Sequence, residues 1–209
     1  MTVKSIFYFH GFNSASKDAN GNLFDRSKLN FISSQCKKNG IVFDAPNIDF
    51  TQFADSINLI EKEISHSLNS GHKVLVMGTS LGGFISEYLG RKFSIPAILI
   101  NPAINPEKSL QSYIQVPAVK LENFATGLEY DWNIEHCKVF DAFTNLNKSS
   151  STNAPRVVML DMADEIIDAH ITAKLYADNS QVIQFEGGNH RFTHIEETWP
   201  VIEDMLGLS

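Results

Sequence analysis

The chain has 209 residues, of which 43% are hydrophobic and 20% are charged, and its formal net charge is −7. This length fits one domain, residues 1–209, that is large enough to bury about 70% of the surface of its unfolded chain. The acidic balance argues against nucleic acid as a partner, and no apolar run is long enough to cross a membrane. Because no signal-peptide pattern opens the sequence, we expect a cytoplasmic protein.

Strand and helix patterns alternate along the chain, which predicts an α/β fold with a mostly parallel sheet and helices on both of its faces. We expect strands at residues 6–9, 41–43, 74–77, 98–100, 155–160 and 181–185, and helices at 23–39, 55–69, 81–92 and 195–206. Residues 103–153 interrupt the alternation and lack a clean strand pattern. They are therefore expected to form a small cap, with a polar linker at 149–153.

The strand at 74–77 runs directly into Gly78-Thr79-Ser80-Leu81-Gly82 and then into a helical pattern. This is the sequence form of a nucleophile elbow, in which a serine occupies a strained turn between strand and helix. The flanking glycines keep Cβ atoms out of the tight crossing. Ser80 is therefore the candidate nucleophile, and a glycine-rich turn with a helix-capping serine is the alternative.

A serine hydroxyl needs a base that takes its proton and a carboxylate that orients the base. The strand at 155–160 is followed by a loop that carries Asp161, Asp164 and Asp168. We favour Asp164 as the acid because it lies at the centre of this loop. Asp161 is interpreted as a turn former and Asp168 as the N-terminal residue of a helix, although Asp168 stays open as an alternative acid.

The strand at 181–185 is followed by the glycine-rich loop Glu186-Gly187-Gly188-Asn189-His190. This loop could bring an imidazole to Ser80, so His190 is the candidate base. His194 is less suitable because it lies near the start of the terminal helix. The resulting order of serine, acid and histidine is the order of the triad in α/β-hydrolases.

Acyl transfer also needs two backbone N–H groups that bind the negative oxygen of the tetrahedral intermediate. Leu81, directly after the nucleophile, is expected to supply one. Phe12 is expected to supply the other from the loop after the first strand, because Gly11 permits the backbone torsions that would point its amide inward. A plain turn is the alternative, but it leaves His10 unexplained.

The expected cap is rich in aromatic side chains that could line a pocket over Ser80. We predict that Tyr113, Tyr130 and Trp132 contact the substrate. The alternative is that these rings only pack the cap onto the core. Because the cap is short, we expect a shallow site that favours short or medium acyl groups.

Several motifs are spread over nearly the whole chain, and they include Tyr8-Phe9-His10-Gly11-Phe12-Asn13-Ser14, Gly78-Thr79-Ser80-Leu81-Gly82-Gly83, Asn101-Pro102-Ala103, Thr126-Gly127 with Tyr130, Asp164-Glu165 with Asp168, and Gly187-Gly188-Asn189-His190-Arg191-Phe192. Through them the chain resembles the UPF0227 (YqiA-like) family of small α/β-hydrolase esterases. The resemblance implies an α/β-hydrolase fold and a triad of Ser80, Asp164 and His190. Ala163 departs from the glycine expected before the acid, which affects only the turn.

Together these residues predict a serine esterase that acts on a small-molecule acyl ester or thioester without a metal or organic cofactor. Cys36 and Cys137 lack metal-ligand spacing and are expected to be buried, reduced thiols. The same triad could serve a peptidase or an amidase, and the fold could also belong to a non-catalytic binding protein. The sequence does not indicate an oligomeric state.

Overall fold

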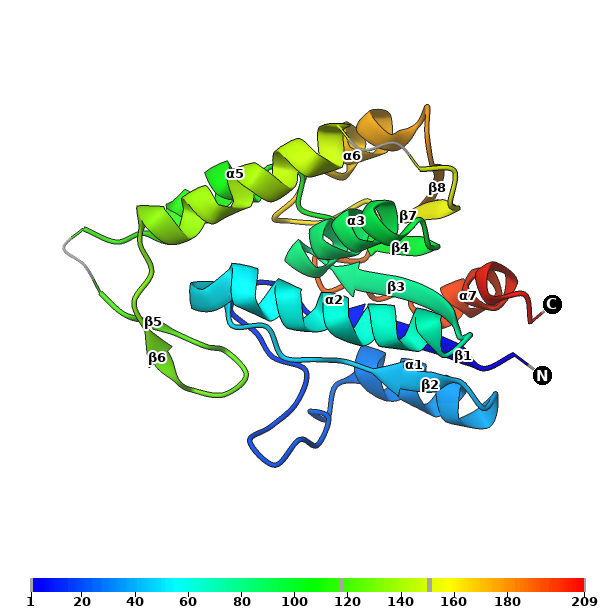
Figure 1. Ribbon diagram of the computed structural model, residues 1–209. Coiled ribbons are helices and arrows are strands. Elements are labelled where there is room, and N and C mark those ends of the chain that lie inside the picture. Colours follow the sequence, from blue (N-terminus) through cyan, green and yellow to red (C-terminus); the bar gives the residue numbers. More distant parts are fainter. Residues whose placement is uncertain (1, 117–118, 150–151, 209) are drawn as a thin grey trace.

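The computed structural model describes residues 2–116, 119–149 and 152–208, and it is built around a six-stranded sheet (Figure 1). Every neighbouring pair of its strands is parallel, in the order β2-β1-β3-β4-β7-β8. The strands are β1 (Lys4–Phe9), β2 (Val42–Asp44), β3 (Lys73–Thr79), β4 (Ala97–Ile100), β7 (Arg156–Asp161) and β8 (Gln181–Phe185). The predicted α/β class and parallel sheet are confirmed.

Helices cover both faces of this sheet, as the alternation of elements predicts. One face packs against α1 (Ser27–Lys38) and α7 (Trp199–Leu206), and the other against α2 (Phe53–Asn69), α3 (Leu81–Phe93) and α6 (Ala169–Tyr176). Within β1, Ile6 and Tyr8 join the first of these cores while Phe7 and Phe9 join the second. Burial on both faces explains why the middles of the central strands are apolar on both sides.

The first and last helices start later than the sequence predicts. Residues 23–26 precede α1, because Leu23 forms an antiparallel bridge with Lys17 and the Phe24 N–H donates to the Ser16 carbonyl. At the other end, residues 196–198 form a separate 3₁₀ turn, and α7 begins at Trp199. The proline that follows Trp199 fits the first turn of a helix, where its missing N–H costs nothing.

The segment between β4 and β7 contains more regular structure than its sequence pattern indicates. It holds α4 (Pro106–Ser109), a 3₁₀ turn (Leu110–Tyr113), the antiparallel strands β5 (Leu121–Glu122) and β6 (Glu129–Tyr130), and α5 (Ile134–Ser149). Helix α5 lies over α2 and α3 (Figure 1), and its buried stripe mixes Cys137 and Phe140 with Thr144 and Asn147. This mixed stripe is a weak helical pattern. Ser150 and Ser151 of the expected linker lie outside the described residues.

The carboxyl ends of the parallel strands meet at one edge of the sheet, which is where ligands bind in such folds. Four non-glycine residues with positive φ occur in the loops after these strands: Asn13 (54°), Ser80 (59°), Asn101 (41°) and Phe192 (65°). Such conformations cost energy and concentrate at functional sites. The strain therefore marks the same edge as the predicted site residues.

Candidate active site

Ser80 lies between the end of β3 and the start of α3 in a strained conformation, with φ 59° and ψ −120°. Its N–H donates to the Ile100 carbonyl, and its own carbonyl accepts the N–H groups of Gly83, Phe84 and Ala103. Hydrogen bonds from both its N–H and its carbonyl therefore fix the Ser80 backbone. The Ser80 side chain makes no capping hydrogen bond to α3, which argues against the alternative of a helix-capping serine.

The glycines of this motif are required by contact between backbones. A Cβ atom at Gly82 would overlap the Phe9 carbonyl, and one at Gly78 would overlap the Gly82 carbonyl. Strand β1, strand β3 and helix α3 can therefore cross closely only without these side chains. A Cβ at Gly11 would lie 3.3 Å from the Ser80 Cβ, so the loop after β1 reaches the serine.

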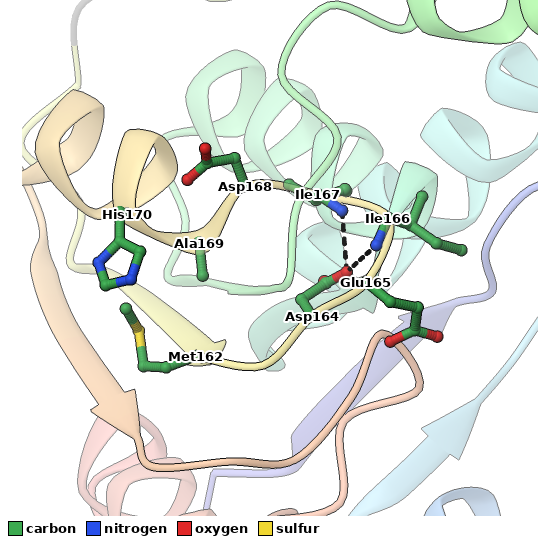
Figure 2. Close-up of a pocket in the computed structure, with 8 residues that line it drawn as sticks. All are labelled: Met162, Asp164, Glu165, Ile166, Ile167, Asp168, Ala169 and His170. Atoms are coloured by element: carbon green, nitrogen blue, oxygen red, sulfur yellow. Dashed lines mark hydrogen bonds between the residues drawn. The ribbon is translucent and has the colours of Figure 1, made fainter.

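The predicted acid and base are hydrogen-bonded to each other. His190 Nδ1 lies 2.8 Å from Asp164 Oδ2, and the side chains of the two residues are 15% and 1% exposed. Asp164 Oδ1 also accepts the N–H groups of Ile166 and Ile167 at 2.8 Å, as Figure 2 shows. Burial acts to raise the pKa of Asp164, but these hydrogen bonds outweigh it and hold the pKa below its usual value.

The alternative acid, Asp168, lies at the N-cap position of α6. Its side chain accepts the Ile171 N–H at 3.0 Å and caps α6. The geometry thus favours Asp164 over Asp168 as the partner of His190.

Since Asp164 occupies His190 Nδ1, Nε2 is the ring nitrogen that is left for Ser80. Within the described part of the chain, the Ser80 hydroxyl has no hydrogen-bond partner of its own.

A hollow of about 340 Å³ lies beside the acid, formed by the loop between β7 and α6 (Figure 2). Its lining includes Asp164, Met162 and His170 but neither Ser80 nor the predicted aromatic contacts of the cap. The hollow therefore belongs to the acid loop and is not the acyl pocket that the sequence predicts.

Asp161 contributes more than the turn expected of it. The turn is present, because the Asp164 N–H donates to the Asp161 carbonyl. In addition, its fully buried carboxylate accepts the N–H groups of Asn189 and Thr193 at 3.0 and 2.8 Å and lies 2.6 Å from His194 Nδ1. Asp161 thus binds the His190 loop on both sides of the histidine. A carboxylate at the end of an apolar strand is the sequence signal for this role.

Two further side chains hold the His190 loop. Glu165 accepts the His190 N–H at 2.9 Å, and the Asn101 amide donates to the carbonyls of Asn189 and His190. Asn101 also accepts the Asp161 N–H, so one amide joins the ends of β4 and β7 to the loop. Sequence reasoning did not assign these contacts, because they join segments that are distant in the chain.

Gly188 is expected to be far less tolerant of substitution than its neighbour Gly187. Both have positive φ, but a Cβ at Gly188 would overlap the Asp161 carboxylate, whereas one at Gly187 meets nothing within 4 Å. Gly187→Ala should cost the strain alone, about 1–2 kcal/mol of unfolding free energy. Gly188→Ala should cost roughly 3–5 kcal/mol, because it also displaces the hydrogen-bonded carboxylate. Urea unfolding of both variants checks this, and equal losses would contradict the contact.

The His10 ring fixes the peptide group between Gly11 and Phe12. The Ile48 N–H donates to His10 Nε2 at 3.0 Å, so Nδ1 carries the ring proton and donates to the Gly11 carbonyl at 2.9 Å. Burial lowers the pKa of His10 to about 4, so the ring is neutral near pH 7. Across a trans peptide the Phe12 N–H points opposite to the Gly11 carbonyl. In the described residues, neither the Phe12 nor the Leu81 N–H has a protein acceptor.

Two of the aromatic residues predicted to contact substrate, Tyr113 and Trp132, pack against Phe12, and the third, Tyr130, packs against Trp132. The ring centroid of Phe12 is 4.7 Å from that of Trp132 and 5.0 Å from that of Tyr113. The Trp132 indole donates to the Leu110 carbonyl and the Tyr130 hydroxyl to the Asn13 side chain, so both also hold the segment in place. The structure therefore places these rings beside the expected oxyanion donor, with clear packing roles.

Comparison with solved structures identifies the fold as that of the α/β hydrolases. A putative hydrolase of the alpha/beta superfamily from Xanthomonas campestris matches 99% of this chain and 99% of its own, with a TM-score of 0.59 and 16% identity. A monoacylglycerol lipase from Paleococcus ferrophilus matches 100% of this chain and 97% of its own, with a TM-score of 0.69 and 15% identity. At these identities the similarity establishes the fold.

The chain belongs to the UPF0227 family. The model of that family, described as an uncharacterised protein family, matches residues 5–207. A UPF0227 protein from Serratia proteamaculans is 25% identical over 198 residues, which cover 91% of this chain and 92% of the relative. The family resemblance predicted from the motifs is confirmed.

Proposed function

We propose that this protein is a serine hydrolase that cleaves carboxylic esters or thioesters with short to medium acyl groups. The hydrogen bond between His190 Nδ1 and Asp164 is the observation that carries the proposal, because it leaves Nε2 to act as the base. The strained turn at Ser80 and its approach to Gly11 support it. The structural similarity to a lipase is consistent with this chemistry but establishes only the fold.

In the proposed reaction, Ser80 Oγ attacks the carbonyl carbon while His190 Nε2 takes its proton. The imidazolium then gives this proton to the leaving alcohol or thiol, and an acyl-enzyme remains. Water attacks the acyl-enzyme with the same proton transfers, which releases the acid and restores Ser80. Asp164 holds the imidazole in the required tautomer and stabilises its positive charge.

The Leu81 and Phe12 N–H groups are the proposed donors to the oxyanion. Both lack a protein acceptor in the described residues, and both adjoin the Ser80 region, one as the next residue and one through Gly11. Such donors stabilise the charge that develops in the transition state, and removal of one costs about 10²–10³ in turnover. His10 supports the Phe12 amide by fixing the preceding carbonyl.

Residues 103–153 are proposed to act as a cap within a single domain of residues 1–209. The β5–β6 hairpin bonds directly to the expected oxyanion loop: the Asn13 amide donates to the Glu122 carbonyl, and the Phe124 N–H donates to the Asn13 carbonyl. We propose that Tyr113, Tyr130 and Trp132 border the acyl site from this side. None of the described helices is both long enough and apolar enough to span a membrane.

The acyl preference is tested with p-nitrophenyl esters of increasing chain length. The short cap predicts the highest kcat/KM for acetate to hexanoate esters and a fall of about tenfold or more for palmitate, since long chains exceed the site. Matched thioesters and anilides should be assayed alongside. A higher kcat/KM for the palmitate ester would contradict the acyl preference, and turnover of anilides alone would favour an amidase.

A further inference from the structure

Lys28 lies in the first turn of α1, outside the set of residues so far assigned to the reaction. Its ammonium group donates to the Thr79 hydroxyl at 2.6 Å and to the Arg191 carbonyl at 2.7 Å. Thr79 directly precedes Ser80, and Arg191 directly follows His190. Among the described residues, no other side chain bonds to both of these neighbours of the proposed nucleophile and base.

Lys28 is partly buried where it meets these two segments. The Thr79 hydroxyl is also within 3.1 Å of the Tyr8 hydroxyl, which is buried in the sheet. Burial lowers the pKa of Lys28 to about 7, while the nearby Asp161 carboxylate acts to raise it and the Arg26 guanidinium to lower it. A partly desolvated cation is costly unless it forms strong hydrogen bonds, and both of its observed bonds are to the proposed site.

From these contacts we infer that Lys28 is a positioning residue, which ties the Ser80 turn to the His190 loop and so fixes the distance between nucleophile and base. The inference rests on the proposed function. Asp161, Asn101 and Glu165 hold the His190 loop to the ends of β4 and β7 and to the acid loop. Lys28 adds the direct connection from this loop to β3, through one side chain of α1. Misplacement of reacting groups by about 1 Å can cost on the order of 10²-fold in rate.

The test compares Lys28→Met with wild type and with Lys37→Met, an exposed lysine in the last turn of the same helix. The second-order rate of labelling by a fluorophosphonate probe and the kcat and KM for p-nitrophenyl butyrate are measured. Lys28→Met should label and turn over about 10–100-fold more slowly, with KM within about twofold of wild type. Lys37→Met should match wild type.

A double-mutant cycle with Thr79→Val separates positioning from a general loss of stability. If Lys28→Met folds poorly, Thr79→Val alone tests the contact, and labelling of this variant at the wild-type rate would contradict it. Thr79→Val removes one acceptor while keeping the side-chain volume, and it should slow labelling by about threefold to tenfold. Each substitution removes the bond between Lys28 and Thr79, and Thr79→Val also removes the contact with the Tyr8 hydroxyl. The loss in the double variant should therefore be smaller than the product of the two single losses.

The role of Lys28 would be overturned by labelling of folded Lys28→Met at the wild-type rate, or by losses that multiply in the double variant. A rise in KM with unchanged kcat would also overturn it, because it would indicate substrate binding. Failure of the proposed function would give a different result, because folded wild-type protein itself would not be labelled. The inference about Lys28 would then be wrong as well.

Discussion

Replacement of Ser80 by alanine should abolish ester hydrolysis while leaving the fold intact. If Ser80 is the nucleophile, the substitution removes the attacking oxygen, so kcat should fall on the order of 10⁵–10⁶-fold, the size of effect known for removal of a catalytic serine. The Ser80 side chain makes no capping bond, and its strain is a property of the backbone, so the unfolding free energy should change by less than about 1 kcal/mol. Hydrolysis of p-nitrophenyl butyrate and thermal unfolding check the two expectations.

Ser112→Ala is the matched control for this substitution. Ser112 is exposed in the 3₁₀ turn of residues 110–113, and among the described residues its hydroxyl donates only to the Ser109 carbonyl. The control variant should therefore hydrolyse the ester at the wild-type rate. If folded Ser80→Ala retained more than a few per cent of the turnover, another residue would be the nucleophile.

Replacement of Asp164 by asparagine should reduce kcat on the order of 10³–10⁴-fold, the size of effect known for a triad carboxylate. In the structure, Asp164 Oδ1 accepts two backbone N–H groups and lies 3.0 Å from His190 Nδ1, while Oδ2 lies closer to Nδ1, at 2.8 Å. The amide oxygen of the variant would take the backbone N–H groups, so the amide NH₂ would face His190 Nδ1. That nitrogen would then become an acceptor, the ring proton would move to Nε2, and the base would be lost.

Asp168→Asn is the control here, because Asp168 is the alternative acid of the same loop. Asparagine is as good an N-cap as aspartate, so α6 should remain stable and activity should stay within about threefold of wild type. Steady-state kinetics of the two variants decide between the carboxylates. A large loss in Asp168→Asn with little loss in Asp164→Asn would reverse the assignment.

The candidate residues could be selected from sequence because their signals are local. The elbow is a continuous pentapeptide after an apolar strand, and the acid and histidine loops each follow their own strand. Parallel strands bring the loops at their carboxyl ends to one edge, so residues 80, 164 and 190 could be expected near one another. The hydrogen bond between Asp164 and His190 is the structural observation that separates Asp164 from Asp168.

The contacts that support these residues could not be found in this way. Lys28 lies 51 residues from Thr79 and 163 from Arg191, and nothing in the pattern of its helix distinguishes it from a surface lysine. Helix α5 was missed because polar residues interrupt its buried stripe. The start of α1 differs from the prediction because Leu23, which has helical periodicity, pairs instead with Lys17 in a short antiparallel bridge.

The central claim is that Ser80 is a nucleophile activated by His190, and covalent labelling tests it most directly. Folded wild type is incubated with a fluorophosphonate, and its intact mass and tryptic peptides are measured beside those of Ser80→Ala and His190→Ala. The account predicts one phosphonyl group per chain, located on Ser80, none in Ser80→Ala, and slow or no labelling in His190→Ala. Folded wild type that gains no mass, or that carries the group on another residue, would contradict it.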